Sequence, residues 1–191
     1  TRKGRRDKPF ALMARDVDAA REVAEVTPEA EALLVSPEAP VVLMPARLGA
    51  LPDAVAPGLD EVGVMRPYAP IHHLLFDAGA PGVLVMTSGN RSSEPIAFRD
   101  DDALDRLAGL ADAFLVGERP IARRVDDSVA RPTAHGPLVV RRARGYAPSS
   151  VARIETDRIV AGRVDGHGGI IEFPCQNEPG GHADHGHGTD P

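Results

Sequence analysis

The chain has 191 residues, 42% of them hydrophobic, which is enough for one domain with a sizeable core. Its formal net charge of −6, its aromatic content of 4% and its lack of Trp argue against general nucleic-acid binding, and its single cysteine, Cys175, excludes a disulfide framework and a cysteine zinc site. Because the sequence shows neither a long apolar run nor a signal peptide, we expect a cytoplasmic protein without a membrane partner.

Strands and helices alternate in the first part of the chain. Thr27 followed by Pro28 has the form of a helix N-cap with Pro at the first helical position, and Ser36-Pro37 ends that helix. The predicted elements are a strand over 9–14, a helix over 17–26, this second short helix, and a strand over 41–44.

The middle of the chain begins with a stretch rich in Pro and Gly, 45–67, for which we expect irregular structure. After it, the pattern predicts a helix around 71–75, a strand over 83–85, a helix over 100–110, and strands over 113–116 and 138–140. This alternation predicts an α/β fold with a twisted mixed sheet, flanking helices, and some antiparallel pairing toward the end.

The last part of the chain loses its periodicity. Gly, His, Asp and Pro dominate from Gly166 onward, so we predict a domain over 1–154 and a disordered tail over 155–191. His182, His185 and His187 lie in this tail, where a flexible segment without a defined fourth ligand makes a metal site the weaker interpretation. No metal ligand is assigned.

A small-polar turn, 86–90, follows the apolar run 83–85 directly. Such a run is typical of a buried parallel strand, and polar ligands bind where such strands end, so we expect Ser88 and Asn90 to point into a crevice. The alternative is that both side chains only cap the local turn.

Lysine is used in one place only. The chain has two lysines, Lys3 and Lys8, and both lie in a basic run at its start. The spacing of Lys3 and Arg5 presents an ammonium and a guanidinium to one anion, for which a phosphate is suited. A solvated basic segment is the competing interpretation.

Five strings occur in the order RKGRRDKPF (2–10), GVMRPYAPIHHLL (63–75), VMTSGN (85–90), DDSVAR (126–131) and RRARGYAP (141–148). Taken together, these strings resemble one family, the YrdC-like domain of the HypF carbamoyltransferases of hydrogenase maturation. The resemblance covers roughly residues 1–150 and implies a YrdC-like fold whose first strands lie outside this chain, so that the domain is N-terminally truncated. Arg66 departs from the family pattern, which usually has an apolar residue there.

The resemblance implies ATP-dependent activation of a carbamoyl group, joined to AMP with release of pyrophosphate, and Mg²⁺ as the companion of ATP. It implies nucleotide binding by Lys3, Arg5, Asn90 and Arg142, and carbamoyl or substrate binding by Ser88 and Ser128. No catalytic residue is assigned. The implied partners are ATP, a carbamoyl donor and, through further domains, a HypE-like protein that accepts the carbamoyl group.

Other interpretations stay open. Asp126 and Asp127 are as well explained by the start of a strand or by pairing with Arg123 and Arg124 as by contact with a metal or a substrate. His72 and His73 are better explained as a polar pair packed against Tyr68 than as a catalytic base, because the sequence places no carboxylate nearby. For the arginines at 141, 142 and 144 the alternative is a solvated strand end.

Two other functions remain as alternatives. One is a threonylcarbamoyl-adenylate synthase for tRNA modification, against which Met65 stands where that class carries Arg. The other is a non-catalytic module that binds double-stranded RNA through its basic segments. RNA is therefore kept as an alternative partner.

Overall fold

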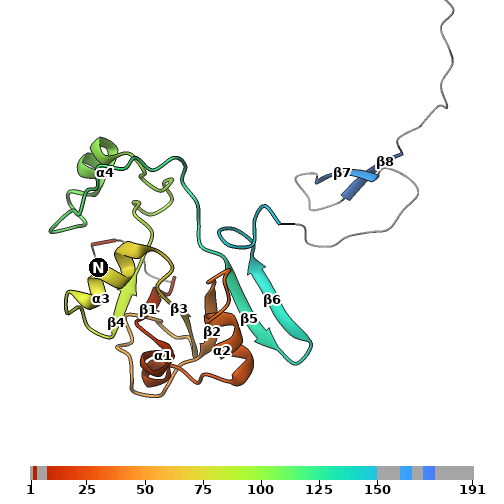
Figure 1. Ribbon diagram of the computed structural model, residues 1–191, viewed down its shortest axis with the longest axis horizontal. Coiled ribbons are helices and arrows are strands. Elements are labelled where there is room, and N and C mark those ends of the chain that lie inside the picture. The colour runs from red at the N-terminus through yellow and green to blue at the C-terminus, as the bar shows by residue number, and fades with distance from the viewer. Residues whose placement is uncertain (1, 4–7, 150–159, 165–169, 175–191) are drawn as a thin grey trace, which may run out of the picture. The chain divides into compact units, whose positions relative to one another are not determined.

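The computed structural model describes residues 2–3, 8–149, 160–164 and 170–174. The chain divides into two units, Thr1–Ser149 and Ser150–Pro191, and the first contains a six-stranded sheet (Figure 1). The strands of this sheet are β1 (Ala11–Ala14), β2 (Val41–Pro45), β3 (Glu61–Met65), β4 (Val83–Met86), β5 (Val129–Thr133) and β6 (Gly136–Arg141), and the helices are α1 (Val17–Val23), α2 (Pro28–Leu34), α3 (Pro70–Asp77) and α4 (Asp100–Leu107).

The sheet is mixed, as predicted, with the order β4-β1-β3-β2-β5-β6. The pairs β1–β3 and β2–β5 are parallel, and the other neighbours are antiparallel. The prediction that 83–85 is a buried parallel strand is wrong. β4 is an edge strand antiparallel to β1, and Val85 on it is 57% exposed.

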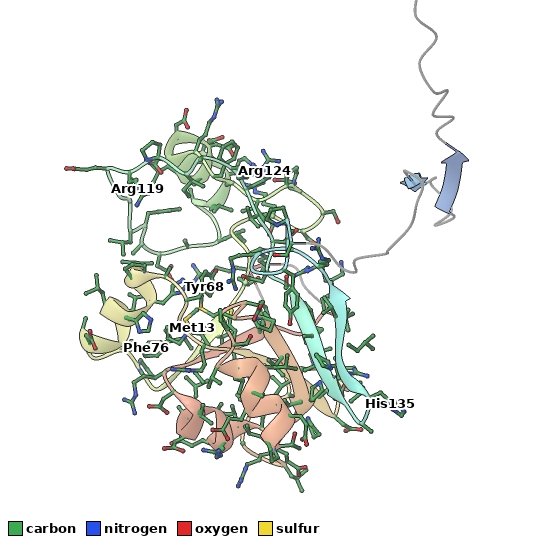
Figure 2. All side chains as sticks on the ribbon, turned by 45° about the vertical axis from the view of Figure 1, so that its right-hand side comes forward. Met13, Tyr68, Phe76, Arg119, Arg124 and His135 are labelled. Carbon is green, nitrogen blue, oxygen red and sulfur yellow. The ribbon has the colours of Figure 1, made fainter. Side chains whose placement is uncertain are left out.

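The two faces of the sheet are packed unequally. On one face, Leu12 and Val64 pack with α1 and α2 in the main core, which also contains Ala20 and Leu34. On the other face, a smaller cluster contains Met13, Val41, Met65 and Phe76 of α3 (Figure 2). Alternate residues of β1 therefore serve two cores, as the period of a strand requires.

Capping residues fix where the first two helices begin. The side chain of Asp16 accepts a hydrogen bond from Ala19 N, and that of Thr27 accepts one from Ala30 N. α1 is shorter than predicted and ends at Val23, because Ala24 leaves the helix to form an isolated bridge with Ala46.

Three further predictions need correction. β3 lies inside the stretch 45–67, which was predicted to be irregular. It is a strand because it pairs with β1 and β2, and its five residues alone do not predict this. β5 is not among the predicted strands; it begins just after Asp127, where the start of a strand was kept only as an alternative. Residues 113–116, predicted as a strand, form none, because no described strand lies beside them to pair with.

The second unit contributes β7 (Val160–Val164) and β8 (Ile170–Pro174), which pair antiparallel. These two strands lie where the sequence predicts disorder; the rest of that predicted tail, including its histidines, lies outside the described residues. No described helix is long and apolar enough to cross a membrane.

Candidate functional site

Four strands begin or end side by side along one edge of the sheet, the edge formed by the ends of the strands. The register places the end of β3, the start of β2, the start of β5 and the end of β6 in one row, through the pairs Val42 with Val64, Val41 with Val129, and Val129 with Arg141. Residues that follow or precede these ends are therefore brought together from distant parts of the sequence. They include Tyr68, Ala39, Asp127 and Arg144, which we call the edge cluster together with His72.

Arg144 is the centre of the edge cluster. Its Nε lies 3.1 Å from Asp127 Oδ1, and an Nη donates to the Ala39 carbonyl at 2.8 Å. Its guanidinium carbon also lies 3.4 Å from the centroid of the Tyr68 ring. Because the side chain of Arg144 is only 23% exposed, these contacts hold it as part of the structure and not as a solvated charge at a strand end.

Gly145 brings this segment close to the turn before β2. Its φ is +88°, and a Cβ at this position would overlap the backbone of Glu38. Only a residue without a side chain fits both demands.

Ser128 joins the strings DDSVAR and RRARGYAP. Its hydroxyl is fully buried, donates to the Arg144 carbonyl at 2.8 Å and accepts from Ala143 N at 2.7 Å. Arg141 Nε adds a bond to the Asp127 carbonyl at 2.8 Å. The structure thus gives the Ser128 hydroxyl two backbone partners, and its predicted contact with substrate stays a prediction.

Tyr68 and His72 pack edge to face, with ring centroids 4.5 Å apart and an interplanar angle of 87°. Burial raises the pKa of Tyr68, and the Asp127 carboxylate raises it further. Burial lowers the pKa of His72, and Arg144 lowers it too, while Asp127 opposes both effects.

The packing of His72 against Tyr68 was predicted correctly. The carboxylate that acts on His72 is not a sequence neighbour but Asp127, which comes from a distant segment. Pairing of Asp127 with Arg123 or Arg124 was wrong as an alternative, because its partner is Arg144.

Lys3, Ser88 and Asn90 form a second group, which we call the lysine group. Lys3 Nζ donates to Asn90 Oδ1 at 3.0 Å and to the Ser88 carbonyl, and Ser88 Oγ donates to Asn90 Oδ1 at 2.7 Å. Asn90 Nδ2 donates to the Glu94 carbonyl at 2.6 Å. Three of the predicted binding residues are therefore in contact, although the last bond also shows the local turn capping expected as an alternative.

The remaining predicted residues are placed differently. Arg142 is exposed and donates to the carbonyls of Tyr146, at 2.7 Å, and Ser149. Its guanidinium therefore stabilises the turn that follows it in the chain. Arg5 lies outside the described residues. The lysine group follows the end of β4, where Met86 pairs with the first residue of β1, Ala11. This is the sheet edge opposite to that of the edge cluster.

The sequence did not reveal that Arg144 contacts Asp127, Ala39 and Tyr68. The strings RPYAPIHHLL and RRARG were recognised, but nothing in a string tells that its members meet at one sheet edge. Among the described residues no group of three His, Cys, Asp or Glu side chains is placed to hold a metal ion.

Comparison with known proteins places this geometry in a family. The Sua5/YciO/YrdC family model, described as "Telomere recombination", matches residues 1–143. The carbamoyltransferase HypF of Rhodobacter capsulatus is 57% identical over 150 residues, which are 78% of this chain and 20% of that protein. The probable carbamoyltransferase HypF of Methanocaldococcus jannaschii is 36% identical over 152 residues, which again are 78% of this chain and 20% of that protein. The chain thus spans about a fifth of the length of these relatives.

Solved structures agree. A crystal structure of full-length HypF in a phosphate- and nucleotide-bound form has a TM-score of 0.73 and 47% identity, covering 77% of this chain and 23% of that one. P. abyssi Sua5 with L-threonine has a TM-score of 0.61 and 21% identity, covering 74% and 42%, so it supports the fold alone. The chain therefore belongs to the Sua5/YciO/YrdC family, and its similarity is to the corresponding part of the HypF carbamoyltransferases.

Proposed function

We propose that this chain carries the carbamoyl-activating function of a HypF-type carbamoyltransferase, the formation of a carbamoyl adenylate from ATP with Mg²⁺. An oxygen of carbamate attacks the α-phosphorus of ATP and forms a new O–P bond. The bond from that phosphorus to the bridging oxygen breaks, and pyrophosphate leaves with the electron pair. Such a reaction depends mainly on positioning and on neutralising phosphate charge.

The observation that carries the proposal is the lysine group. The Lys3 ammonium is fixed beside two short polar side chains, Ser88 and Asn90, by a bond of 3.0 Å to Asn90 Oδ1. A positive charge held next to a hydroxyl and an amide is suited to a phosphate and to the small polar carbamoyl group. The nucleotide-bound form of a relative that is 47% identical supports this interpretation.

The other predicted residues have weaker support. Arg142 would have to exchange its two backbone carbonyl partners for a phosphate, and Ser128 would have to give up two buried hydrogen bonds. We therefore propose Lys3 and Asn90 as the main nucleotide contacts and Ser88 as the carbamoyl contact, with Arg5 as a further nucleotide contact implied by the family.

The wider setting is proposed from the same similarity. The relatives named HypF support a place in the maturation of [NiFe]-hydrogenase in the cytoplasm, with a HypE-like protein as the final acceptor of the carbamoyl group. That transfer would use domains outside the fifth of HypF that this chain matches.

Calorimetric titration of the chain with MgATP tests the proposal, with Lys3→Ala as the variant and Lys8→Ala as the matched control. Lys8 is the other lysine of the chain and is exposed. Loss of a charged hydrogen bond to phosphate is worth about 1.5–3 kcal/mol, so Lys3→Ala should weaken binding by about 10- to 100-fold. Lys8→Ala should leave the affinity within about threefold.

A second measurement tests the chemistry. With carbamate supplied from ammonium bicarbonate, exchange of labelled pyrophosphate into ATP should require carbamate and should fall in Asn90→Ala. Equal MgATP affinity in Lys3→Ala and Lys8→Ala would remove the proposed site. Exchange that is independent of carbamate would remove the proposed reaction.

A further inference from the structure

Arg106 of α4 is bonded to the loop that carries Ser88 and Asn90. This loop, residues 88–97, follows β4 in the chain. Arg106 Nη2 donates to Glu94 Oε2 and to the Pro95 carbonyl, each at 2.8 Å. Because the side chain of Arg106 is only 23% exposed, these contacts are largely shielded from water.

The same arginine is fixed to its own helix. Arg106 Nη1 pairs with Asp102, one turn earlier in α4, at 2.8 Å, and the Arg106 carbonyl accepts a bond of 2.8 Å from Arg91 Nε in the loop. No residue of α4 is fully buried, and α4 lies beyond the ends of the strands and not on a face of the sheet (Figure 1). The bonds of Arg106 therefore join this helix to the loop.

The Glu94 carbonyl determines how the Asn90 amide is turned. Asn90 Nδ2 donates to this carbonyl at 2.6 Å, while Asn90 Oδ1 accepts from Ser88 Oγ at 2.7 Å and from Lys3 Nζ at 3.0 Å. A carbonyl only accepts hydrogen bonds, and an ammonium only donates them. If the amide turned over, its NH₂ group would face the Lys3 ammonium and its oxygen would face a carbonyl, so both contacts would be lost. The position of the Glu94 carbonyl thus selects the orientation in which Asn90 meets Lys3.

The turn that leads to Glu94 is strained. Glu94 N donates to the Arg91 carbonyl at 3.1 Å, and the third residue of this turn, Ser93, has a φ of +68°. This is the left-handed region, which residues with a Cβ rarely adopt and which turns of this kind usually fill with glycine. Such a conformation persists only where its surroundings hold it. Arg106 supplies such a hold, because it contacts the two residues that follow Ser93.

We propose that Arg106 is a positioning residue for the lysine group. Its bonds to the Glu94 carboxylate and the Pro95 carbonyl fix the backbone on both sides of the peptide bond between these residues. The Glu94 carbonyl in turn holds the Asn90 amide with its oxygen toward Lys3. Arg106 acts through Asn90 and does not itself touch the nucleotide. Its effect on nucleotide binding rests on the proposed function, whereas its effect on Asn90 is measured without any nucleotide.

Arg21→Gln is the matched control for Arg106→Gln. Arg21 also pairs with an acidic residue of its own helix, Asp18 at 2.8 Å, and with one outside it, Glu31 at 2.6 Å. Both of its partners belong to α1 and α2, so its loss removes a similar set of ion pairs without touching the loop 88–97.

NMR of the full chain without nucleotide tests the orientation of Asn90. Ala97 N closes the loop with a bond of 2.8 Å to the Gly89 carbonyl, so its hydrogen exchange reports on opening of the loop. Arg106→Gln should speed this exchange by about fivefold or more. It should also move the signals of the Asn90 side-chain amide toward those of an amide in water. Arg21→Gln should leave both observations unchanged.

Coupling to Asn90 separates positioning from a purely structural role. In calorimetric titration with MgATP, Arg106→Gln should weaken binding by about three- to tenfold, the value of one neutral hydrogen bond. In an Asn90→Ala background the same change should have an effect of less than about twofold, because no amide is left to orient. A purely structural effect of Arg106 would be the same in both backgrounds.

Glu94→Gln provides a second variant. It keeps the backbone carbonyl that Asn90 uses and removes the charge that Arg106 holds, so it should change the exchange at Ala97 and the Asn90 signals in the same direction as Arg106→Gln. It keeps the test decisive should Arg106→Gln fail to fold, which the urea unfolding midpoint would show.

The outcomes are distinguishable. Unchanged Ala97 exchange and unchanged Asn90 signals in the folded variants overturn the inference, and so does an equal loss of MgATP affinity with and without Asn90→Ala. If the NMR changes occur while Lys3→Ala binds MgATP normally, or while the unchanged chain binds no MgATP, the proposed nucleotide site fails and the role of Arg106 in orienting Asn90 stands.

Discussion

Removal of the Ser128 hydroxyl should destabilise the chain much more than its size suggests. In Ser128→Ala the side chain keeps nearly the same shape, but Ala143 N and the Arg144 carbonyl lose partners at 2.7 and 2.8 Å. An unpaired polar group in the interior costs about 1–3 kcal/mol. Because residues 143 and 144 are partly exposed, water can reach some of this surface, so we expect a loss of about 2–4 kcal/mol in the free energy of unfolding.

Ser36 supplies a matched control. Its hydroxyl oxygen is also buried, but it has no hydrogen-bond partner in the described part of the chain. Ser36→Ala removes an unpaired polar atom and should leave stability unchanged or raise it by about 1 kcal/mol. Urea unfolding measures both variants, and a loss of this size should lower the midpoint for Ser128→Ala by about 1–2 M at an unchanged slope. Equal effects of the two substitutions would refute the reasoning.

Three other results are expected. Gly145→Ala should cost at least about 2 kcal/mol in urea unfolding, since its Cβ meets Glu38, whereas Gly136→Ala, with a positive φ but open space, should cost about 1 kcal/mol; equal costs would contradict the close approach. Asp127→Asn should lower the pKa of His72 further, as followed by NMR titration, because the carboxylate now opposes the effect of burial. Burial lowers the pKa of His72 in the folded state, so the unfolded state binds the proton more tightly, and the free energy of unfolding should fall as the pH drops below about 6.5. His72→Gln should reduce this loss of stability in acid. A pH profile of stability that is the same in His72→Gln and in the unchanged chain would contradict the prediction.

The sequence predicted local features of this fold well. Thr27 and Pro28 correctly predicted the start of α2, because helix capping depends only on neighbouring residues. The packing of His72 on Tyr68 was also predicted, because the two residues are four positions apart at the start of α3, which keeps their side chains close. These signals are local, and so is the contact of Ser88 with Asn90.

Non-local pairing was not predictable in the same way. β3 was missed because its neighbours in the sheet, and not its own five residues, make it a strand. The assignment of β4 as a parallel strand failed because the apolar run at 83–85 does not reveal the direction of its partner.

The edge cluster shows the same limit at the site. Asp127 and Arg144 meet at the base of the β5–β6 hairpin, and they meet Ala39 and Tyr68 because β2 lies between β3 and β5, an order that no motif contains. Lys3 was singled out correctly by the scarcity of lysine, but its contact with Asn90 spans most of the domain and needed the structure.

The β5–β6 hairpin is joined to the sheet by a short ladder, two residue pairs between β2 and β5, with the Val41 N to Ser128 O bond beside it. Beyond this ladder the hairpin is held by the burial of Ala130 in the main core, by the ion pair of Arg131 with Glu61, and by the contacts of Arg144 with Ala39 and Tyr68. A hairpin at the edge of a sheet, with so few backbone pairs to its neighbour, opens as a cooperative unit below the cost of global unfolding. Amide protons of β5 and β6 should exchange with solvent before those of β1 and β3, and loss of the Arg144 contacts should speed exchange in the hairpin while the central strands stay protected.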